Sequence, residues 1–461
     1  MSEIKQLLDN RFDDATEAAD DGKFAEAVSI CNEIVRLDRT HNEAWKLRTE
    51  MLIAIGRRDL AFENAREATK LFPKIRAHRL MQARIHVLER RWDKAAATYR
   101  AVLRDHPLHM NAIRELMDFE QITPEDDICK RLNAGQDNPD LNVYDRASTQ
   151  FLQGQIYMNA GRDEEAFAFF EEGNRQMRAV HEGVRLEYSF SRCLPEFDAA
   201  FQRRHQQPER PADCPLFVIA GLPRSGKSLL ERLLSSQPDL VAGGETAKIY
   251  KIFLDVDRSR GADVAMEKLL SRKVSPIRRY FEAVLANGPK PKARRVIDTT
   301  PGNLEQLAFL GPLHPDVPIV FVQREPRDFA AALYFKQFNK AHRYTYDLEV
   351  AARAIARTEH LAKRWRETMP NPTITVSYEE LVADPVGVAA RILGHFSMPV
   401  DRAALEAAAF GDGRQLNLTP GRSLDGVGMI SSDLVGFSRR FAGRLASTMS
   451  AYLTEQQRLT A

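Results

Sequence analysis

Small residues, apolar residues and prolines recur every 34 positions along the first 110 residues. The recurring positions are Gly22 and Gly56; Ala27, Ala61 and Ala95; Ile34, Ala68 and Val102; and Pro73 and Pro107. Small residues suit places where two helices approach closely, and large apolar residues fill the space between them. A proline at the end of each segment closes a helix, because proline cannot continue one. The period therefore predicts stacked helix pairs.

A further unit follows after an interruption. Its segment begins at Gly154 and has its turn at Gly161, whereas strict continuation of the period would place that turn at residue 158. The stretch from Met110 to Tyr144 contains two prolines and is predicted to form irregular helices. The 34-residue period resembles a tetratricopeptide-repeat array, which implies an all-helical domain over residues 1–190. Such an array binds a peptide, braces a neighbouring domain or forms a homodimer, and all three roles stay open.

The second half of the chain has a different pattern. The segment RRHQQPERPADCP, residues 203–215, is polar and contains three prolines, so residues 191–214 are predicted to be a linker. Over residues 215–461, short β-rich runs alternate with helical segments. This order predicts an α/β P-loop domain with a parallel sheet that binds ligands at the carboxyl ends of its strands. The predicted strands are 216–220, 295–298, 318–323 and 373–378.

The composition is that of a globular protein, with 44% hydrophobic and 28% charged residues. A net charge of +2 argues against a surface for nucleic acid, which normally carries a larger basic excess. The longest apolar runs are far shorter than the roughly 18 residues of a membrane helix, and the first ten residues lack an apolar signal region. Four cysteines without metal-binding spacing predict neither disulfides nor a zinc site. These features predict a cytoplasmic protein with no integral membrane segment.

A glycine-rich loop, GLPRSGKS, begins at Gly221 directly after the first predicted strand and precedes a helical segment. Strand, loop and helix in this order form a cradle that binds phosphate groups at a helix N-terminus. Gly221 and Gly226 allow the backbone to bend and approach the ligand, while Arg224 and Lys227 add positive charge. The loop also satisfies the pattern of P-loop nucleotide triphosphatases, in which Asp298, at the end of a predicted strand, would be a magnesium ligand.

Four segments of the second half together resemble sulfotransferases, in the order that this family has them. The loop and the following GGE are similar to the segment that binds the 5′-phosphosulfate, and QREPRDFAAALYFKQF, residues 323–338, is similar to the 3′-phosphate segment. YDLEVAARAIARTEHLAKRW and VSYEELVADP resemble the segments that follow. With the repeats, the chain resembles bacterial tetratricopeptide-repeat-containing sulfotransferases, relatives of protein-tyrosine sulfotransferases. The resemblance implies transfer of a sulfuryl group from 3′-phosphoadenosine 5′-phosphosulfate (PAPS) to a hydroxyl, without a metal ion.

The resemblance also implies roles for individual residues. Glu245 matches the carboxylate that acts as general base, a role worth roughly 10²- to 10⁴-fold in rate. Arg224 and Lys227 would stabilise negative charge in the transition state, and the guanidinium of Arg324 would bind the 3′-phosphate. The residues implied to contact the cofactor are Pro223, Arg224, Ser225, Gly226, Lys227, Ser228, Leu229, Arg324, Arg327 and Tyr378.

Each of the following residues also has a possible structural role. Glu245 would otherwise be a surface loop carboxylate, and Arg324 would otherwise form an ion pair with Glu325 or Asp328. His342 is expected to be structural or to line the substrate site rather than to act as a base.

The sequence departs from the family pattern at three positions. Lys227 stands where the family loop has a threonine, Thr299 stands where a lysine often follows the strand, and Ala332 stands where a serine contributes a hydroxyl to the cofactor. We hypothesise that Lys227 supplies the charge that Thr299 lacks, and that Arg327 compensates for Ala332.

Three functions stay open. The favoured one is a PAPS-dependent sulfotransferase acting on a protein or peptide, a saccharide or a small molecule, in which Asp298 is a structural acid. The second is a P-loop kinase or NTPase that uses Mg-ATP. The third is a catalytically inactive scaffold of the sulfotransferase fold with a peptide-binding repeat domain, suggested by Thr299 and Ala332.

Overall fold

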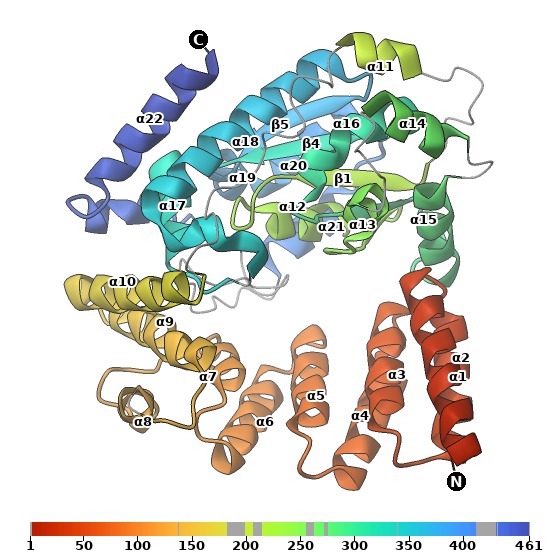
Figure 1. Ribbon diagram of the computed structural model, residues 1–461, viewed down its shortest axis with the longest axis vertical. Helices are drawn as coiled ribbons and strands as arrows, with labels where there is room; N and C mark the ends of the chain where they lie inside the picture. The colour runs from red at the N-terminus through yellow and green to blue at the C-terminus, as the bar shows by residue number, and fades with distance from the viewer. Residues whose placement is uncertain are drawn as a thin grey trace.

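The fold is seen in a computed structural model that describes residues 2–136, 138–181, 199–205, 214–254, 262–271, 275–338, 340–411, 430 and 432–460. A curved array of helices forms the N-terminal part, and an α/β domain lies above it (Figure 1). Most of the linker predicted over residues 191–214 lies outside the described residues. Within its bounds, α11 (Ala199–His205) packs on the α/β domain through a hydrogen bond of 2.8 Å from Gln202 to the carbonyl of Ala308.

Helices α1 to α10 form the array; successive helices pack on one another from α1 to α7 and from α8 to α10, and α7 packs on α9. Their bounds are α1 (Ser2–Asp20), α2 (Phe24–Leu37), α3 (Asn42–Ala54), α4 (Arg58–Leu71), α5 (Arg76–Leu88), α6 (Trp92–Asp105), α7 (Met110–Leu116), α8 (Asp127–Gly135), α9 (Val143–Asn159) and α10 (Asp163–Val180). The turns at Gly22, Gly56 and Gly161 have φ of +77°, +78° and +75°, which glycine adopts without strain. The predicted helix pairs, including the turn displaced to Gly161, are confirmed.

The α/β domain is built on a sheet of five strands in the order β2-β3-β1-β4-β5, and its described pairings are all parallel. The strands are β1 (Leu216–Ala220), β2 (Leu240–Ala242), β3 (Arg295–Asp298), β4 (Ile319–Gln323) and β5 (Thr373–Ser377). The predicted parallel α/β fold is confirmed, and the sequence pattern misses only the three-residue edge strand β2. Tyr378, predicted as the end of a strand, begins a helix because Ser377 caps that helix by accepting the N–H of Glu380 at 3.1 Å.

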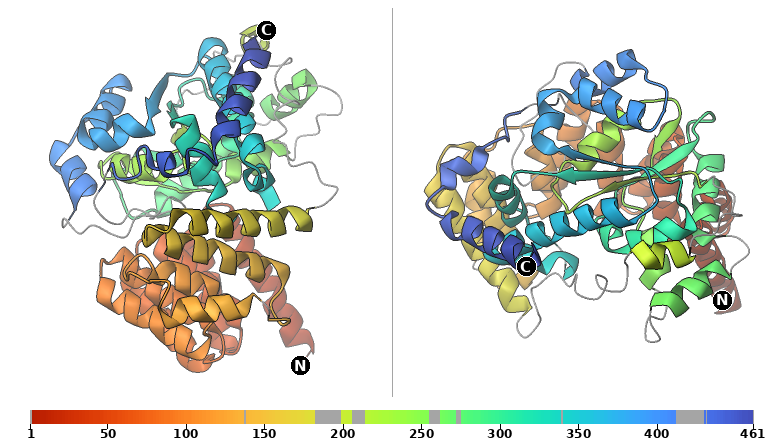
Figure 2. Two further views of the ribbon diagram at one scale, coloured as in Figure 1. Left: turned by 90° about the vertical axis from the view of Figure 1, so that its left-hand side faces the viewer. Right: turned by 90° about the horizontal axis from the view of Figure 1, so that it is seen from above.

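Helices cover both faces of the sheet (Figure 2). They are α12 (Lys227–Leu234), α13 (Lys248–Leu254), α14 (Ala262–Leu270), α15 (Pro276–Asn287), α16 (Asn303–Leu313), α17 (Pro326–Tyr334), α18 (Leu348–Thr368), α19 (Tyr378–Ala383), α20 (Pro385–His395), α21 (Arg402–Phe410) and α22 (Ala446–Thr460), with short 3₁₀ segments η2 (Lys340–Tyr346) and η3 (Phe437–Phe441). Val218 on β1 packs with α16 and α18, whereas Ile219 packs with α12 and α20. Strand β1 is thus buried on both faces, and the loop after it lies at the edge where parallel sheets bind ligands.

The sequence predicts no integral membrane segment, and the helices of the structure can be compared with this prediction by their length and apolarity. Among the residues described, none of the helices has the length and apolarity needed to cross a bilayer.

An aromatic cluster joins the end of the array to the α/β domain. Phe170 on α10 stacks on Phe335, directly after α17, with ring centroids 4.3 Å apart, and Phe335 also packs edge-on against Phe441 in η3. Ala332 on α17 is buried in the same cluster. The array and α17 therefore share one apolar core.

Truncation of this core should destabilise the whole chain. We expect Phe335→Ala to lower the free energy of unfolding by about 3–5 kcal/mol, because Phe335 is fully buried and its loss leaves a cavity. Urea denaturation measures the change, with Phe410→Ala, whose ring is 43% exposed, as the matched control. A loss below about 1 kcal/mol for Phe335→Ala would contradict the shared core.

Candidate active site

The loop after β1 turns sharply into α12, and its glycines are required by close contacts. A Cβ at Gly221 would lie 2.9 Å from Ser225 Oγ and equally close to a carbonyl oxygen of β4. Gly226 has φ of +107°, and a Cβ there would lie 3.0 Å from the ring of Tyr378. Arg224 has φ of +70°, a conformation that costs a non-glycine residue free energy and is concentrated at functional sites.

Lys227, the first residue of α12, is buried beneath this loop. Its Nζ donates hydrogen bonds of 2.9 Å to the carbonyl oxygens of Gly221 and Leu222. Burial lowers its pKa to about 8, and the negative charges of Glu245 and Glu231 partly oppose that shift. The ammonium therefore lies inside the loop, within electrostatic range of Glu245.

Further donors line the loop and the start of α12. Hydrogen bonding within the helix begins with the N–H of Leu230, which donates to the carbonyl of Gly226 at 3.1 Å, so the N–H groups of residues 227–229 have no acceptor in the helix. Ser225 Oγ is buried and has no hydrogen-bond partner within the described part of the chain. Pro223 is buried, while Ser228 and Leu229 are half-buried. This set of donors suits an anion.

Arg324 follows β4 and is only 4% exposed. Its Nη1 and Nη2 donate hydrogen bonds of 3.2 Å to the carbonyl oxygens of Arg224 and Leu434. The guanidinium carbon lies 4.1 Å from the centroid of the Tyr378 ring, which is a cation–π contact. Burial lowers the pKa of Arg324, yet a guanidinium remains charged at neutral pH. Arg324 thus joins the loop, α19 and the C-terminal segment.

The neighbouring acids have other partners. Glu325 caps α17 by accepting the N–H of Asp328 at 2.7 Å. Asp328 accepts the N–H groups of Gly436 at 2.5 Å and Ser438 at 3.0 Å. The alternative in which Arg324 forms an ion pair with Glu325 or Asp328 is therefore wrong, because those carboxylates are directed at backbone N–H groups.

Arg327 and Ala332 lie on α17 in different surroundings. Arg327 is half-buried, and its Nε has no hydrogen-bond partner among the described residues. Ala332 is fully buried against the aromatic side chains of the array. A serine hydroxyl would be costly there without a partner, so packing explains the alanine. The compensation by Arg327 stays a prediction.

The loop between β2 and α13 carries Glu245, whose side chain is exposed. Both neighbours of Glu245 are held in place: the N–H of Gly244 donates to Glu231 Oε1 at 2.7 Å, and the hydroxyl of Thr246 donates to Asp298 Oδ2. The other oxygen of Asp298 accepts two hydrogen bonds of 2.8 Å from residues that follow β3. Burial raises the pKa of Asp298. Asp298 acts here as a support of the loop.

Two further observations concern metal and base chemistry. The described residues contain no group of three or more histidine, cysteine, aspartate or glutamate side chains that could hold a metal ion.

His342 in η2 is close enough to Lys227 to respond to its charge, and burial together with that charge lowers its pKa to about 4. His342 is therefore neutral and weakly basic at neutral pH. The sequence contains no signal for its proximity to Lys227.

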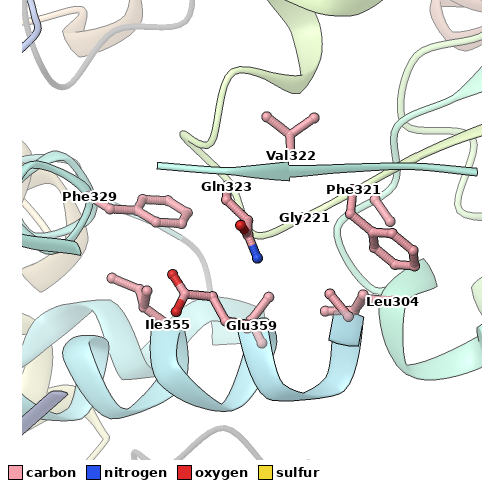
Figure 3. A pocket seen from close by; sticks show the side chains of 11 residues that line it. Gly221, Leu304, Phe321, Val322, Gln323, Phe329, Ile355 and Glu359 are labelled. Carbon is pink, nitrogen blue, oxygen red and sulfur yellow. The ribbon is translucent and has the colours of Figure 1, made fainter. Parts of the chain in front are cut away.

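A small pocket of about 10 Å³ borders Gly221 between the strand ends and α18 (Figure 3). Its wall is mostly apolar, and the side chains of Gln323 and Glu359 reach into it (Figure 3). Burial raises the pKa of Glu359, which accepts a hydrogen bond of 2.5 Å from the hydroxyl of Tyr452 on α22. None of the residues predicted to bind a cofactor lines this pocket. Sequence reasoning misses it because its wall comes from four separate segments.

The predicted residues of the loop, Arg324 and Tyr378 come together from three segments that are distant in sequence. Arg324 contacts the loop at Arg224 and the ring of Tyr378, and Tyr378 contacts Gly226. Lys227 links the loop electrostatically to Glu245. The arrangement provides buried positive charge, unpaired donors and one exposed carboxylate, which suits binding of an anion next to a group that can accept a proton.

Residues 215–402 match the sulfotransferase family. A protein-tyrosine sulfotransferase of Drosophila melanogaster is 26% identical over 210 residues, which cover 43% of this chain and 41% of that protein. An uncharacterized protein of Aquifex aeolicus is 20% identical over 380 residues, which cover 79% of this chain and 49% of that protein. The chain thus spans half or less of the length of these curated relatives.

Among solved structures, a sulfotransferase domain from the Synechococcus PCC 7002 olefin synthase matches 54% of this chain and 97% of its own, with 20% identity and a TM-score of 0.36. Sulfotransferase STF9 from Mycobacterium avium matches 72% of this chain and 98% of its own, with 15% identity and a TM-score of 0.30. Residues 215–402 thus match a sulfotransferase family model, and the chain has distant similarity to a protein-tyrosine sulfotransferase.

The lowered pKa of Lys227 should appear in the pH dependence of stability. Between about pH 8 and 10.5 the lysine is neutral when folded and charged when unfolded, so the unfolded state binds more protons and stability rises with pH. We expect the free energy of unfolding of the wild type, relative to Lys227→Met, to rise by up to about 3 kcal/mol between pH 7.5 and 10.5. Urea denaturation at both pH values measures this, since the other titrating groups cancel in the difference. A difference that is independent of pH would contradict it.

Proposed function

We propose that this chain is a PAPS-dependent sulfotransferase that transfers a sulfuryl group to a hydroxyl. The observation that carries the proposal is that the buried, charged side chain of Arg324 donates a hydrogen bond to the carbonyl of Arg224 in the loop after β1. Two sites of positive charge at a fixed separation suit a ligand with two anionic ends, and PAPS is such a ligand. The sulfotransferase family match supports the same ligand.

The residues present fit PAPS. The loop residues Pro223 to Leu229 would hold the 5′-phosphosulfate, since Ser225 Oγ has no partner in the described ranges and the first N–H groups of α12 have no acceptor in the helix. Arg324 and Arg327 would hold the 3′-phosphate, with Tyr378 supporting Arg324 from below its guanidinium. When bound, PAPS supplies an activated sulfuryl group on a phosphate leaving group.

Glu245 is proposed as the general base. Its carboxylate is exposed to an incoming hydroxyl, while the flanking residues Gly244 and Thr246 are held by hydrogen bonds. The carboxylate can accept the hydroxyl proton.

Lys227 and Arg224 are proposed to stabilise the charge that develops on the leaving oxygen. The ammonium of Lys227 is bound by two loop carbonyls at 2.9 Å, so it is placed without further ordering. This position supports the hypothesis that Lys227 supplies the charge absent at Thr299.

The array is proposed to be a tetratricopeptide-repeat array that favours a protein or peptide acceptor over a saccharide or small molecule. It packs on the helix that follows Arg324 and, at its other end, on the helix that follows Glu245. An extended chain bound by the array would lie close to the site.

Ligand binding tests the proposal directly. We expect 3′,5′-bisphosphoadenosine, in the presence of EDTA, to stabilise the chain by about 3 kcal/mol at a hundredfold excess over its dissociation constant, and Mg-ATP to stabilise it less. Arg324→Lys should weaken binding about 10- to 100-fold, because lysine cannot replace a planar fork of donors. Thermal shift and calorimetry measure both effects. Stronger stabilisation by Mg-ATP would favour the kinase or NTPase alternative.

Turnover tests the base. We expect Glu245→Gln to lower sulfuryl transfer from PAPS by about 10²- to 10⁴-fold, with the affinity for bisphosphoadenosine unchanged, because the amide cannot accept the proton. Release of bisphosphoadenosine, measured with peptide, saccharide and small hydroxyl acceptors, reports the rate. Equal rates in wild type and variant would exclude Glu245 as the base, and binding without turnover would favour the inactive scaffold.

A further inference from the structure

The array contacts the α/β domain at both of its ends (Figure 1). Its C-terminal end is fixed by the aromatic cluster, in which Phe170 and Phe335 are fully buried. A buried amide adds a polar bond there, since Asn174 donates to the carbonyl of Tyr334 at 2.8 Å. Apolar burial on this scale contributes several kcal/mol, so this end is permanently attached.

The N-terminal end is attached by ion pairs and hydrogen bonds together with a smaller apolar contact, in which Phe24 on α2 packs against the core of the α/β domain. The turn Asp20–Gly22, between α1 and α2, lies against α13 and α15. Lys248 Nζ donates to the carbonyl of Asp20 at 2.9 Å and lies 3.5 Å from the carboxylate of Asp21. Lys251 lies 3.7 Å from the carboxylate of Asp20. These ion pairs are partly exposed, and pairs of this kind contribute only about 0–1 kcal/mol each and are screened by salt.

The fit of this turn against α15 is close. Gly22 has φ of +77°, and a Cβ there would lie 2.9 Å from Val284 Cγ2. The ammonium of Lys248 also lies 5.0 Å from the centroid of the Tyr280 ring. The turn, α15 and Lys248 therefore meet at one point, which makes the attachment specific.

Lys248 is also part of the loop that carries Glu245. It is the first residue of α13, and its N–H donates to the hydroxyl of Thr246 at 3.2 Å. Between them, Ala247 has φ of +54°, a strained conformation that the surroundings must maintain. Movement of Lys248 would therefore act on Thr246 and so on its neighbour Glu245.

We propose that the turn Asp20–Gly22 of the first helix pair is a positioning element for Glu245, which acts by holding Lys248. Release of the turn from Lys248 loosens the loop 243–247 and lowers turnover. This inference rests on the proposed function, in which Glu245 is the base. It makes the array a regulator of the site in addition to an acceptor-binding surface.

Hydrogen exchange in the full-length chain tests the coupling without reference to activity. Lys248→Met keeps the apolar stem on Tyr280 and removes the charge, whereas Lys248→Arg keeps the charge. We expect exchange of residues 16–24 and 243–254 to become about 3- to 10-fold faster in Lys248→Met, and to remain near wild type in Lys248→Arg. Lys363→Met on α18 is the matched control, because Lys363 is 64% exposed and pairs only with Glu367 on its own helix in the described structure.

Turnover of PAPS supplies the second readout. Lys248→Met should lower kcat about 3- to 10-fold and leave KM for PAPS unchanged, and salt at 0.5 M should reproduce this effect in the wild type because it screens the same ion pairs. Unchanged exchange of residues 243–254 would overturn the inference, as would equally faster exchange throughout the chain or a change confined to KM. If the wild type binds no bisphosphoadenosine, the proposed function fails, and exchange still decides whether the turn holds the loop.

Discussion

Burial of the Arg324 guanidinium is the constraint on which the arrangement of the site depends. A buried cation costs several kcal/mol unless polar groups surround it, so each partner must be held in place by the fold. Two backbone carbonyls, of Arg224 and Leu434, and the face of the Tyr378 ring surround it. These partners lie on the loop after β1, on the segment before η3 and at the start of α19. The loop, the C-terminal segment and β5 are therefore brought to one place by a single side chain.

A second buried cation sets the electrostatics of the site. Lys227 lies under the loop, and two of the acids near it accept hydrogen bonds: Glu231 accepts the N–H of Gly244, and Asp298 accepts the hydroxyl of Thr246. These two carboxylates balance part of the lysine charge, and their hydrogen bonds hold Gly244 and Thr246 on either side of Glu245. The exposed carboxylate of Glu245 lies beside this buried positive charge, an arrangement that the proposed transfer of an anionic group to a hydroxyl would use.

The sequence predicts what is local and periodic. The 34-residue period places the turn glycines, and it also marks Arg90, which takes the glycine position of its unit with φ of +57°. The glycine loop and Arg324 follow from short motifs attached to strands. The partners of Asp328, the proximity of His342 to Lys227 and the pocket beside Glu359 depend on how distant segments pack, and no spacing in the sequence encodes that packing.

The array explains one departure from the family pattern. Ala332 lies on the helix that begins two residues after Arg324, and the same stretch ends in Phe335, which stacks on Phe170 of the array. The array buries that face of α17, so the residue at position 332 packs against aromatic rings. A small apolar side chain is favoured there, because a buried hydroxyl without a partner would be costly. The helix that follows Arg324 is therefore packed against the array on one side and against α18 and α22 on the other. Loss of the array would expose this apolar face. The boundary predicted from the sequence at residue 215 therefore divides the chain into a helical array and an α/β domain whose side chains pack into one core.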